Sequence, residues 1–305
     1  MLLTDAGIRR SPPTEVLSPG AIRTLAALNL LHELERVEIA RPCLGIIRQW
    51  GDSPERDDFL RAAGAKGWIV DREAFDELLA GRACNAGARW LHARLVDLSG
   101  VAGAWQLHLR DQSGSRLVRA GFVVDASGRA RAVGRRLGAA AQRTAQLIAT
   151  WREPSPDSTS PAPAEWLEVR AEEGSWTYTL VGPRGGALTV EVTSAPTSPK
   201  GGSKRASACG QLSSACAGPG WAAVGDAAAA YDPITGQGLG HALGSALALV
   251  AALDAALSDP TDARGLDAYS AAVHSTFRRS AVGARYVYGV GAERLGGAFW
   301  HALAN

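Results

Sequence analysis

The residues with the clearest chemical pattern lie between positions 225 and 241, in the run GDAAAAYDPITGQGLGH. Asp226 follows a short apolar segment, so it is expected at the C-terminal end of a buried strand, where open α/β folds bind ligands. Pro233 fixes φ, and Gly236 and Gly238 let the backbone approach a ligand before an apolar helix begins. The first free N–H groups of that helix suit an electron-rich carbonyl or a developing anion.

The segments around this run alternate between strand and helix patterns. In chain order they predict a buried strand over 1–4, a helix over 21–37, a strand over 68–70, a helix over 72–86, several strands between 88 and 125, a β-rich block after a Pro/Ser-rich loop over 153–164, and helices over 238–257 and 266–280, with a short terminal helix. This order favours a nucleotide-binding α/β core interrupted by a substrate-side sheet, and not a helical bundle or a β-sandwich.

Composition narrows the class of protein further. The 305 residues are 46% hydrophobic, and 32 basic against 30 acidic side chains leave a formal charge of +2, so a sizeable core and a small-molecule partner are expected, with no nucleic acid and no membrane. The longest apolar run, 242–257, is predicted to be too short to span a bilayer. Four scattered cysteines lack the spacing of a metal or redox site, which favours a reducing, cytoplasmic location and predicts no metal.

The run that begins at Gly225 resembles the GD…DPxxGxG element of the flavoprotein monooxygenase and flavin-dependent halogenase superfamily. The resemblance implies that FAD is the cofactor and that Asp226 binds its ribityl chain. The residues that it places against the isoalloxazine ring are Pro233, Gly236, Gln237 and Gly238.

Two further segments match the superfamily in the same order along the chain. FVVDASGR resembles its second strand-turn motif and implies cofactor contacts from Asp125 and Gly128. WIVDREAFDELL resembles its helix motif, whose arginine, here Arg72, lies near the ribose and pyrophosphate of FAD. The opening MLLTDAG resembles the second strand of the family's first βαβ unit, which assigns Asp5 to the adenosine ribose.

The resemblance implies an FAD-binding, Rossmann-like core of the p-hydroxybenzoate-hydroxylase type, with a β-rich substrate domain and with the first βα unit missing. The expected division is an FAD-binding core over 1–145 that includes a small meander over 88–120, a β-rich block over 146–215, the flavin-ring segment over 216–258 and C-terminal helices over 259–305. No GxGxxG turn precedes the strand at 1–4, and Met1 is the only methionine in the chain. We therefore hypothesise that the sequence is an N-terminally truncated version of a longer flavoprotein.

The accessory residues favour one branch of the superfamily over another. Trp176 and Tyr178 occupy the strand in which halogenases carry a WxWxIP segment, but the second Trp and the IP are absent, so a halogenase is disfavoured. The pattern is closer to halogenase-like maturases of quinone-cofactor amino-acid oxidases, which hydroxylate a peptidyl tryptophan. Arg48, Trp176 and Tyr178 are the substrate-side candidates, although a core position explains the two aromatics equally well and a solvated strand position explains Arg48 better.

The expected function is an FAD-dependent monooxygenase that acts on an electron-rich aromatic, either a small molecule or a peptidyl residue. NAD(P)H or a separate flavin reductase would donate electrons, and a partner oxidase is a further expected partner. No catalytic side chain is identified. The alternatives are a truncated, non-catalytic remnant or scaffold that binds no FAD, a halogenase, and a lipid reductase that shares the FAD motifs.

Overall fold

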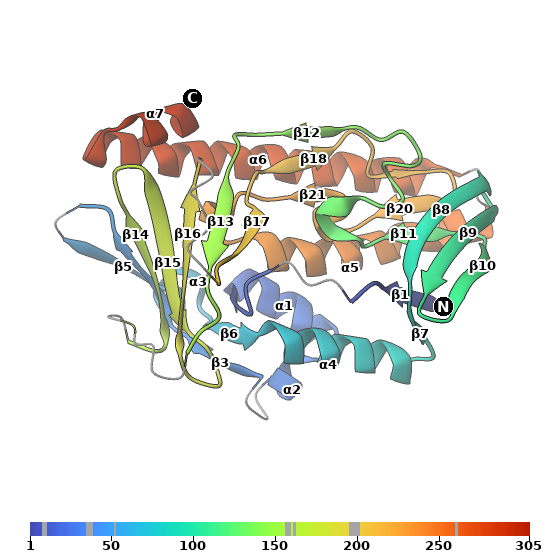
Figure 1. Cartoon of the computed structure of the whole chain (residues 1–305), viewed down its shortest axis with the longest axis horizontal. Coiled ribbons are helices and arrows are strands. Elements are labelled where there is room, and N and C mark those ends of the chain that lie inside the picture. The colour runs from blue at the N-terminus through green and yellow to red at the C-terminus, as the bar shows by residue number, and fades with distance from the viewer. Residues whose placement is uncertain are drawn as a thin grey trace.

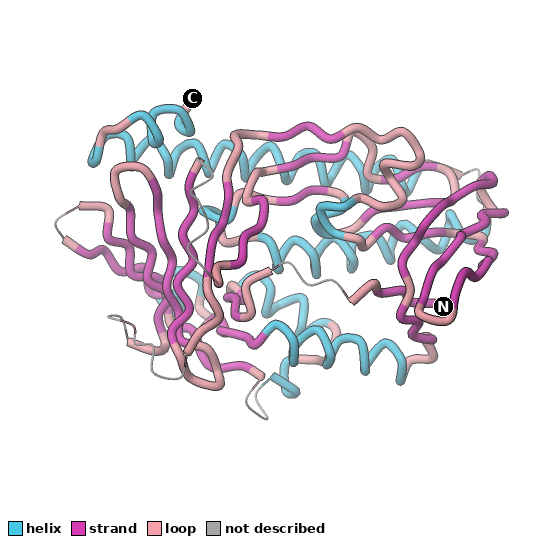
Figure 2. The backbone as a smooth tube through the Cα atoms, in the orientation of Figure 1, coloured by secondary structure: helices cyan, strands magenta, loops and turns pink. Residues whose placement is uncertain are grey.

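Helix α6 (Arg264–Leu295) runs along most of the long axis of the molecule and connects its two β-rich ends (Figure 1). The structure is a computed structural model that describes residues 1–7, 11–34, 39–51, 53–155, 160, 163–194, 202–259 and 262–305. A seven-stranded sheet lies at one end and a small meander at the other, with helices between them (Figure 2). The predicted α/β fold with a separate β-rich part is confirmed.

The predicted first strand forms, and it belongs to a parallel pair. β1 (Leu2–Asp5) pairs with β7 (Arg89–His92), while β11 (Val123–Asp125) pairs in parallel with β20 (Trp221–Ala223), which also pairs with β19 (Ala217–Gly218). Among the described strands, β1 has no partner besides β7, and β11 has none besides β20. The ends of these strands point Asp5 and Asp125 to the same region of the molecule, because both residues line one cavity.

The meander predicted over 88–120 is present over residues 94–120, because the strand at 89–92 pairs with β1 instead. It consists of β8 (Arg94–Val101), β9 (Ala104–Asp111) and β10 (Gly114–Ala120), joined as antiparallel neighbours. Trp105 anchors the meander to the core, because its side chain is 6% exposed and its Nε1 donates to the Gly220 carbonyl oxygen at 2.8 Å.

The large sheet contains two strands from outside the β-rich block predicted over 146–215. Its strands, in spatial order, are β17 (Lys204–Ser207), β13 (Ile148–Trp151), β16 (Ala187–Thr193), β15 (Ser175–Val181), β14 (Trp166–Ala171), β4 (Gly45–Gln49) and β5 (Pro54–Asp58). β4 runs parallel to β14, and all other neighbours are antiparallel. A segment early in the chain therefore completes the substrate-side sheet.

Two smaller sheets connect the large sheet to the helices. One is antiparallel and has the order β2 (Thr14–Leu17), β6 (Gly67–Asp71) and β3 (Ala40–Cys43). The other has the order β12 (Ala141–Arg143), β18 (Gln211–Ser213) and β21 (Ala229–Ala230). The first of these sheets continues directly into helix α4 (Arg72–Asn85), which the sequence placed one residue longer, over 72–86. A short helix, α3 (Phe59–Ala63), follows β5.

The single helix predicted over 21–37 is wrong. The chain instead forms α1 (Pro19–Ala27) and α2 (Leu31–Leu34), and residues 35–38 lie outside the described residues. Asn29 adopts the left-handed conformation with φ 54°, and the Leu30 N–H donates to the Leu25 carbonyl at 2.9 Å, as in a Schellman motif. Both leucines are buried in one core cluster, so burial of Leu30 favours termination of the helix at this point.

The C-terminal helices are longer than predicted. α6 continues from Arg264 to Leu295 without the predicted end at 280, and α7 (Ala298–Ala304) follows. Buried residues recur along α6 at spacings of three and four, from Leu266 through Phe277 to Tyr288, so one face packs along its whole length. Tertiary packing outweighs the low helix propensity of its internal glycines.

The predicted apolar helix after Gly236 is α5 (Gly238–Ser258). Its mean hydropathy of 1.5 over 18 residues makes it long and apolar enough to cross a membrane, which corrects the prediction that this run is too short. Only 22% of that window is buried in the structure. Leu249 packs in the core, whereas Val250 and Leu257 are 58% and 59% exposed and border a large cavity.

The contact between α6 and α7 offers a test of this architecture. A Cβ on Gly291 would lie 2.7 Å from Cδ2 of the buried Trp300 and closer still to its Cε3, so Gly291→Ala is expected to lower the free energy of unfolding by about 1–3 kcal/mol. Gly289→Ala on the same helix meets nothing within 4 Å and is the control, with an expected gain of up to about 1 kcal/mol. Urea denaturation measures both. Equal effects of the two substitutions would contradict the packing described.

Candidate functional site

A cavity of about 3070 Å³ lies between the α/β core, the meander and the inner face of the large sheet. It takes lining residues from segments that are far apart in the sequence, including the strand ends at Asp5 and Asp125, the start of α4 and the turn into α5. Drug-sized ligands occupy pockets of roughly 300–1,000 Å³. The cavity therefore has room for a large cofactor together with a second molecule.

Nine of the ten predicted cofactor-binding residues line this cavity. They are Asp5, Arg72, Asp125, Gly128, Asp226, Pro233, Gly236, Gln237 and Gly238. The tenth, Gly225, is buried beside it: its N–H donates to Ser245 Oγ at 2.9 Å, and a Cβ would lie 3.3 Å from the Cβ of Ala242. Gly225 thus lets the turn pack against α5 and has no face on the cavity.

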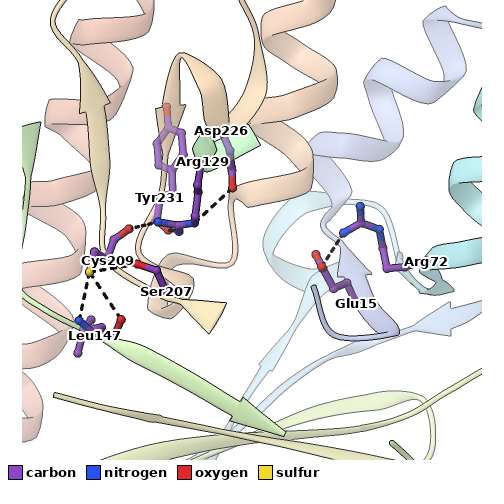
Figure 3. Close-up of polar contacts among 8 residues, drawn as sticks. All are labelled: Glu15, Arg72, Arg129, Leu147, Ser207, Cys209, Asp226 and Tyr231. Carbon is purple, nitrogen blue, oxygen red and sulfur yellow. Dashed lines mark hydrogen bonds and ion pairs between the residues drawn. The ribbon is translucent and has the colours of Figure 1, made fainter. Parts of the chain in front are cut away.

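Asp226 lies in a 3₁₀ turn (Gly225–Ala227) that follows β20, as the sequence predicted. Its Oδ2 is 3.5 Å from Arg129 Nε, and Arg129 also donates from Nη1 to the Cys209 carbonyl and from Nη2 to the Tyr231 carbonyl (Figure 3). Burial raises the pKa of Asp226, while Arg129 and Arg72 act in the opposite direction. The carboxylate remains 37% exposed, so it can accept hydrogen bonds from a ligand in the cavity.

The glycine-rich turn places the N-terminus of α5 at the cavity. Asp232 caps a 3₁₀ turn (Pro233–Thr235) by accepting from the Ile234 N–H at 3.0 Å, and Gly236 then takes a left-handed conformation with φ 60°. No side chain caps the following helix, because Gln237 at the N-cap position makes no capping hydrogen bond. The N-terminal end of α5 therefore faces the cavity with its partial positive charge available to a ligand.

Asp232 does not line the cavity, but it holds the glycine-rich turn against α6, a role that the sequence analysis missed. The Tyr288 hydroxyl on α6 donates to its Oδ1 at 3.0 Å and lies 3.1 Å from Oδ2. Burial raises the pKa of Asp232 to about 6, although hydrogen bonds from Ile234 and Tyr288 favour the ionised form. The sequence could not reveal this contact, because 56 residues separate its partners.

His241 and Asp125 have structural partners. The Tyr231 hydroxyl and His241 Nδ1 are 3.1 Å apart, and burial lowers the pKa of His241 to about 4, which favours the neutral imidazole. The Asp125 carboxylate accepts from the N–H groups of Val133 at 2.8 Å and Gly134 at 2.9 Å, and from both donors of Ser127. These bonds hold the turn after β11, and a cofactor contact from Asp125 stays a prediction.

The substrate-side candidates lie together on the large sheet. Arg48 on β4, and Trp176 and Tyr178 on β15, all line the cavity, and the two aromatic rings are 6.0 Å apart. Trp176 is also a core residue, with 1% exposure. The position next to the cavity and the position in the core, which the sequence left as alternatives, therefore both apply to Trp176. Arg48 forms an ion pair with Asp57.

The described residues contain no group of three or more His, Cys, Asp or Glu side chains that could hold a metal ion. All four cysteines are free. Cys209 lies beside the cavity and accepts from the Leu147 N–H at 3.3 Å (Figure 3).

Comparison with known proteins identifies the architecture. Neither a protein-family model nor a curated protein sequence matches the chain. Among solved structures, the peptidyl tryptophan dihydroxylase QhpG, which is essential for tryptophylquinone cofactor biogenesis, superposes over 99% of this chain and 72% of its own, with a TM-score of 0.79 and 21% identity. The fold is that of flavin-dependent monooxygenases and halogenases.

Two further structures agree with that assignment. The flavin-dependent halogenase CmlS matches 100% of this chain and 63% of its own, with a TM-score of 0.82 and 18% identity. Aklavinone-11 hydroxylase, solved with FAD and aklavinone, matches 97% of this chain and 64% of its own, with a TM-score of 0.77 and 16% identity. The chain thus spans less than two thirds of the length of these two proteins.

The raised pKa of Asp232 predicts a pH dependence of stability. A carboxyl group whose pKa is about 6 in the folded state, against about 4 unfolded, stabilises the fold below pH 4 and loses that contribution as the pH rises through 6. Asp232→Asn removes this contribution, so the stability of the variant relative to wild type should increase between pH 4 and pH 7. Urea unfolding across that range measures it.

Asp262→Asn is the matched control, because hydrogen bonds from Arg264 lower the pKa of Asp262 to about 2. Its difference from wild type should stay constant between pH 4 and pH 7 and change only at lower pH. A constant difference for Asp232→Asn as well would contradict the burial of the Asp232 carboxyl.

Proposed function

We propose that this protein is an FAD-dependent monooxygenase that hydroxylates an electron-rich aromatic group. The observation that carries the proposal is the arrangement of Asp226 and the Pro233–Gly238 turn at an uncapped helix N-terminus, on a cavity whose opposite wall bears Trp176 and Tyr178. A carboxylate, the positively polarised N-terminus of a helix and two aromatic side chains therefore line the same cavity.

The residues of the cavity fit FAD in three respects. Gly236 and Gly238 have open space where a Cβ would stand, so a planar ring can approach the backbone there. Asp226 offers a partly exposed carboxylate to hydroxyl donors. Arg72 lines the cavity with a buried Nε that has no hydrogen-bond partner among the described residues, and a phosphate oxygen would satisfy such a donor.

Each of these groups has a defined task in the proposed reaction. FAD, when bound, supplies the redox chemistry that activates dioxygen. Asp226 accepts hydrogen bonds from the ribityl hydroxyls and Arg72 neutralises phosphate charge. The N-terminus of α5 stabilises negative charge on the ring, because its free N–H groups point to the cavity. The large sheet excludes water from the ring with apolar side chains such as Leu167 and Val169.

The substrate wall supports an aromatic substrate, and the size of the cavity supports a peptidyl one. QhpG, which has the same fold, acts on peptidyl tryptophan. We extend that substrate class to this chain, with a partner oxidase as the protein that carries the tryptophan. NAD(P)H or a separate flavin reductase is the proposed electron donor, and four free cysteines support a reducing compartment such as the cytoplasm.

The halogenases of the superfamily that this chain resembles use a catalytic lysine, and the positions of the lysines here favour hydroxylation over halogenation. Lys204 forms an ion pair with Glu153, and Lys66 lies 4.5 Å from the centre of the Trp68 ring. Neither lines the cavity, and Lys200 lies outside the described residues.

One observation favours the alternative of a protein that binds no FAD and acts as a scaffold. The free edges of β1 and β11 border the cavity at the end where Asp5 would hold the adenosine ribose, and exposed apolar side chains such as Val124 and Val250 lie around them. Binding measurements separate the two functions.

FAD titration of the purified protein, followed by quenching of flavin fluorescence, tests the proposal. Saturable binding is expected, and Asp226→Ala should raise the Kd about tenfold or more, because it removes hydrogen bonds to a charged acceptor. Asp254→Ala, an exposed carboxylate on α5, should leave the Kd unchanged. A colourless protein that does not bind excess FAD would reject the monooxygenase and support the scaffold.

A further inference from the structure

An ion pair at the edge of the cavity joins Glu15 on β2 to Arg72 at the start of α4. Arg72 Nη1 donates to Glu15 Oε1 at 2.6 Å, and the two side chains are only 18% and 25% exposed (Figure 3). Arg72 Nη2 lies 3.3 Å from Asp76 Oδ1, one helical turn further along α4. Carboxylates thus hold both terminal nitrogens of the guanidinium.

Backbone pairing fixes where this contact forms. In the antiparallel ladder of β2 and β6, Thr14 is opposite Asp71 and Glu15 is opposite Val70, and the Arg72 N–H donates to the Pro13 carbonyl at 2.9 Å. Glu15 therefore cannot move relative to the first turn of α4 unless the ladder breaks. A guanidinium is planar and rigid, so two fixed acceptors determine the orientation of its remaining donors.

The third guanidinium nitrogen, Nε, is the one that a ligand could use. Arg72 Nε is buried and has no hydrogen-bond partner among the described residues, and both Glu15 and Arg72 line the cavity. Asp226 and Arg129 form a second ion pair on the neighbouring wall (Figure 3), close enough that Arg72 lowers the pKa of Asp226. The two pairs present a cation and a hydroxyl acceptor to one ligand.

We propose that Glu15 is a positioning residue for the phosphate-binding half of the cavity: it acts through Arg72, whose guanidinium it orients toward the phosphate of the bound nucleotide. This inference rests on the proposed function, which supplies the nucleotide. Glu15 itself does not contact the ligand, because an anionic phosphate repels a carboxylate and Arg72, the cation beside Glu15, is already its partner. The motifs of the sequence gave no reason to select Glu15.

Substitution at position 15 separates orientation from charge. Glu15→Gln keeps an acceptor for Arg72 Nη1 and removes one negative charge, so its FAD affinity should equal or exceed that of wild type. Glu15→Ala removes the acceptor, and its Kd for FAD should rise about tenfold, the change that follows from losing one hydrogen bond to a charged group. Riboflavin, which carries no phosphate, should bind all three proteins equally. Asp254→Ala is the control, because Asp254 is an exposed carboxylate of α5 that does not line the cavity.

The double variant Glu15→Ala, Arg72→Ala shows whether Glu15 acts through Arg72. The effect of Glu15→Ala on FAD affinity should disappear in the Arg72→Ala background. Three results would overturn the proposal. The effect of Glu15→Ala could persist in the Arg72→Ala background, or Glu15→Ala could lose riboflavin affinity to the same extent as FAD affinity. The third is a Glu15→Gln protein that binds FAD as weakly as Glu15→Ala. Urea denaturation checks that each variant is folded at the temperature of the titration.

A measurement without FAD keeps this inference distinct from the proposed function. In nitrogen-15 spectra of the ligand-free protein, the Arg72 Nε–H resonance should be resolved and slow to exchange in wild type and in Glu15→Gln. It should broaden or exchange rapidly in Glu15→Ala, because the guanidinium is then free to rotate. If the protein does not bind FAD but the Arg72 Nε–H resonance differs between wild type and Glu15→Ala as expected, the nucleotide ligand is rejected. Glu15 is then still the residue that orients Arg72. An unchanged resonance in Glu15→Ala would reject the positioning role.

Discussion

The packing of α6 against both halves of the molecule determines the geometry of the site. Its first half, from Leu266 to Phe277, packs in the core that contains β11, β20 and α5, and its second half, from Ala284 to Ala292, packs in the core beneath the large sheet. The cavity is the space between these two cores. The distance between the glycine-rich turn and the aromatic wall therefore depends on one continuous helix, and the hydrogen bond from Tyr288 to Asp232 ties the turn to that helix.

Buried charges define the chemistry of the cavity and of the turn beside it. Glu15, Asp226 and Asp232 each lose hydration on folding, and in each case burial is the largest effect on the pKa. Arg72 and Arg129 compensate the first two, while a neutral tyrosine hydroxyl serves the third. Because an uncompensated buried carboxylate is costly, a ligand with hydroxyl donors and phosphate oxygens gains interactions here that an apolar ligand would not.

Local patterns predicted much of this site, and distant contacts explain what they missed. The turn around Gly236 and the strand end at Asp226 could be read from the sequence, because backbone conformation and chain order dictate them. The break at Asn29 was missed because the buried Leu30, three residues beyond the end of the helix, decides it, and not the helical pattern. β4 was missed because its stability comes from pairing with β14, more than 100 residues later. Glu15 was missed for the same reason, since its role depends on a partner across a strand ladder.

The free edges of β1 and β11 and the apolar face of α5 also govern how the protein behaves in solution. Unpaired strand edges are templates for further pairing, and exposed leucine and valine side chains add hydrophobic attraction. No edge lysine blunts β1 or β11, whose sequences are LLTD and VVD. We therefore expect this surface to favour self-association, which would limit the concentration at which the chain can be handled.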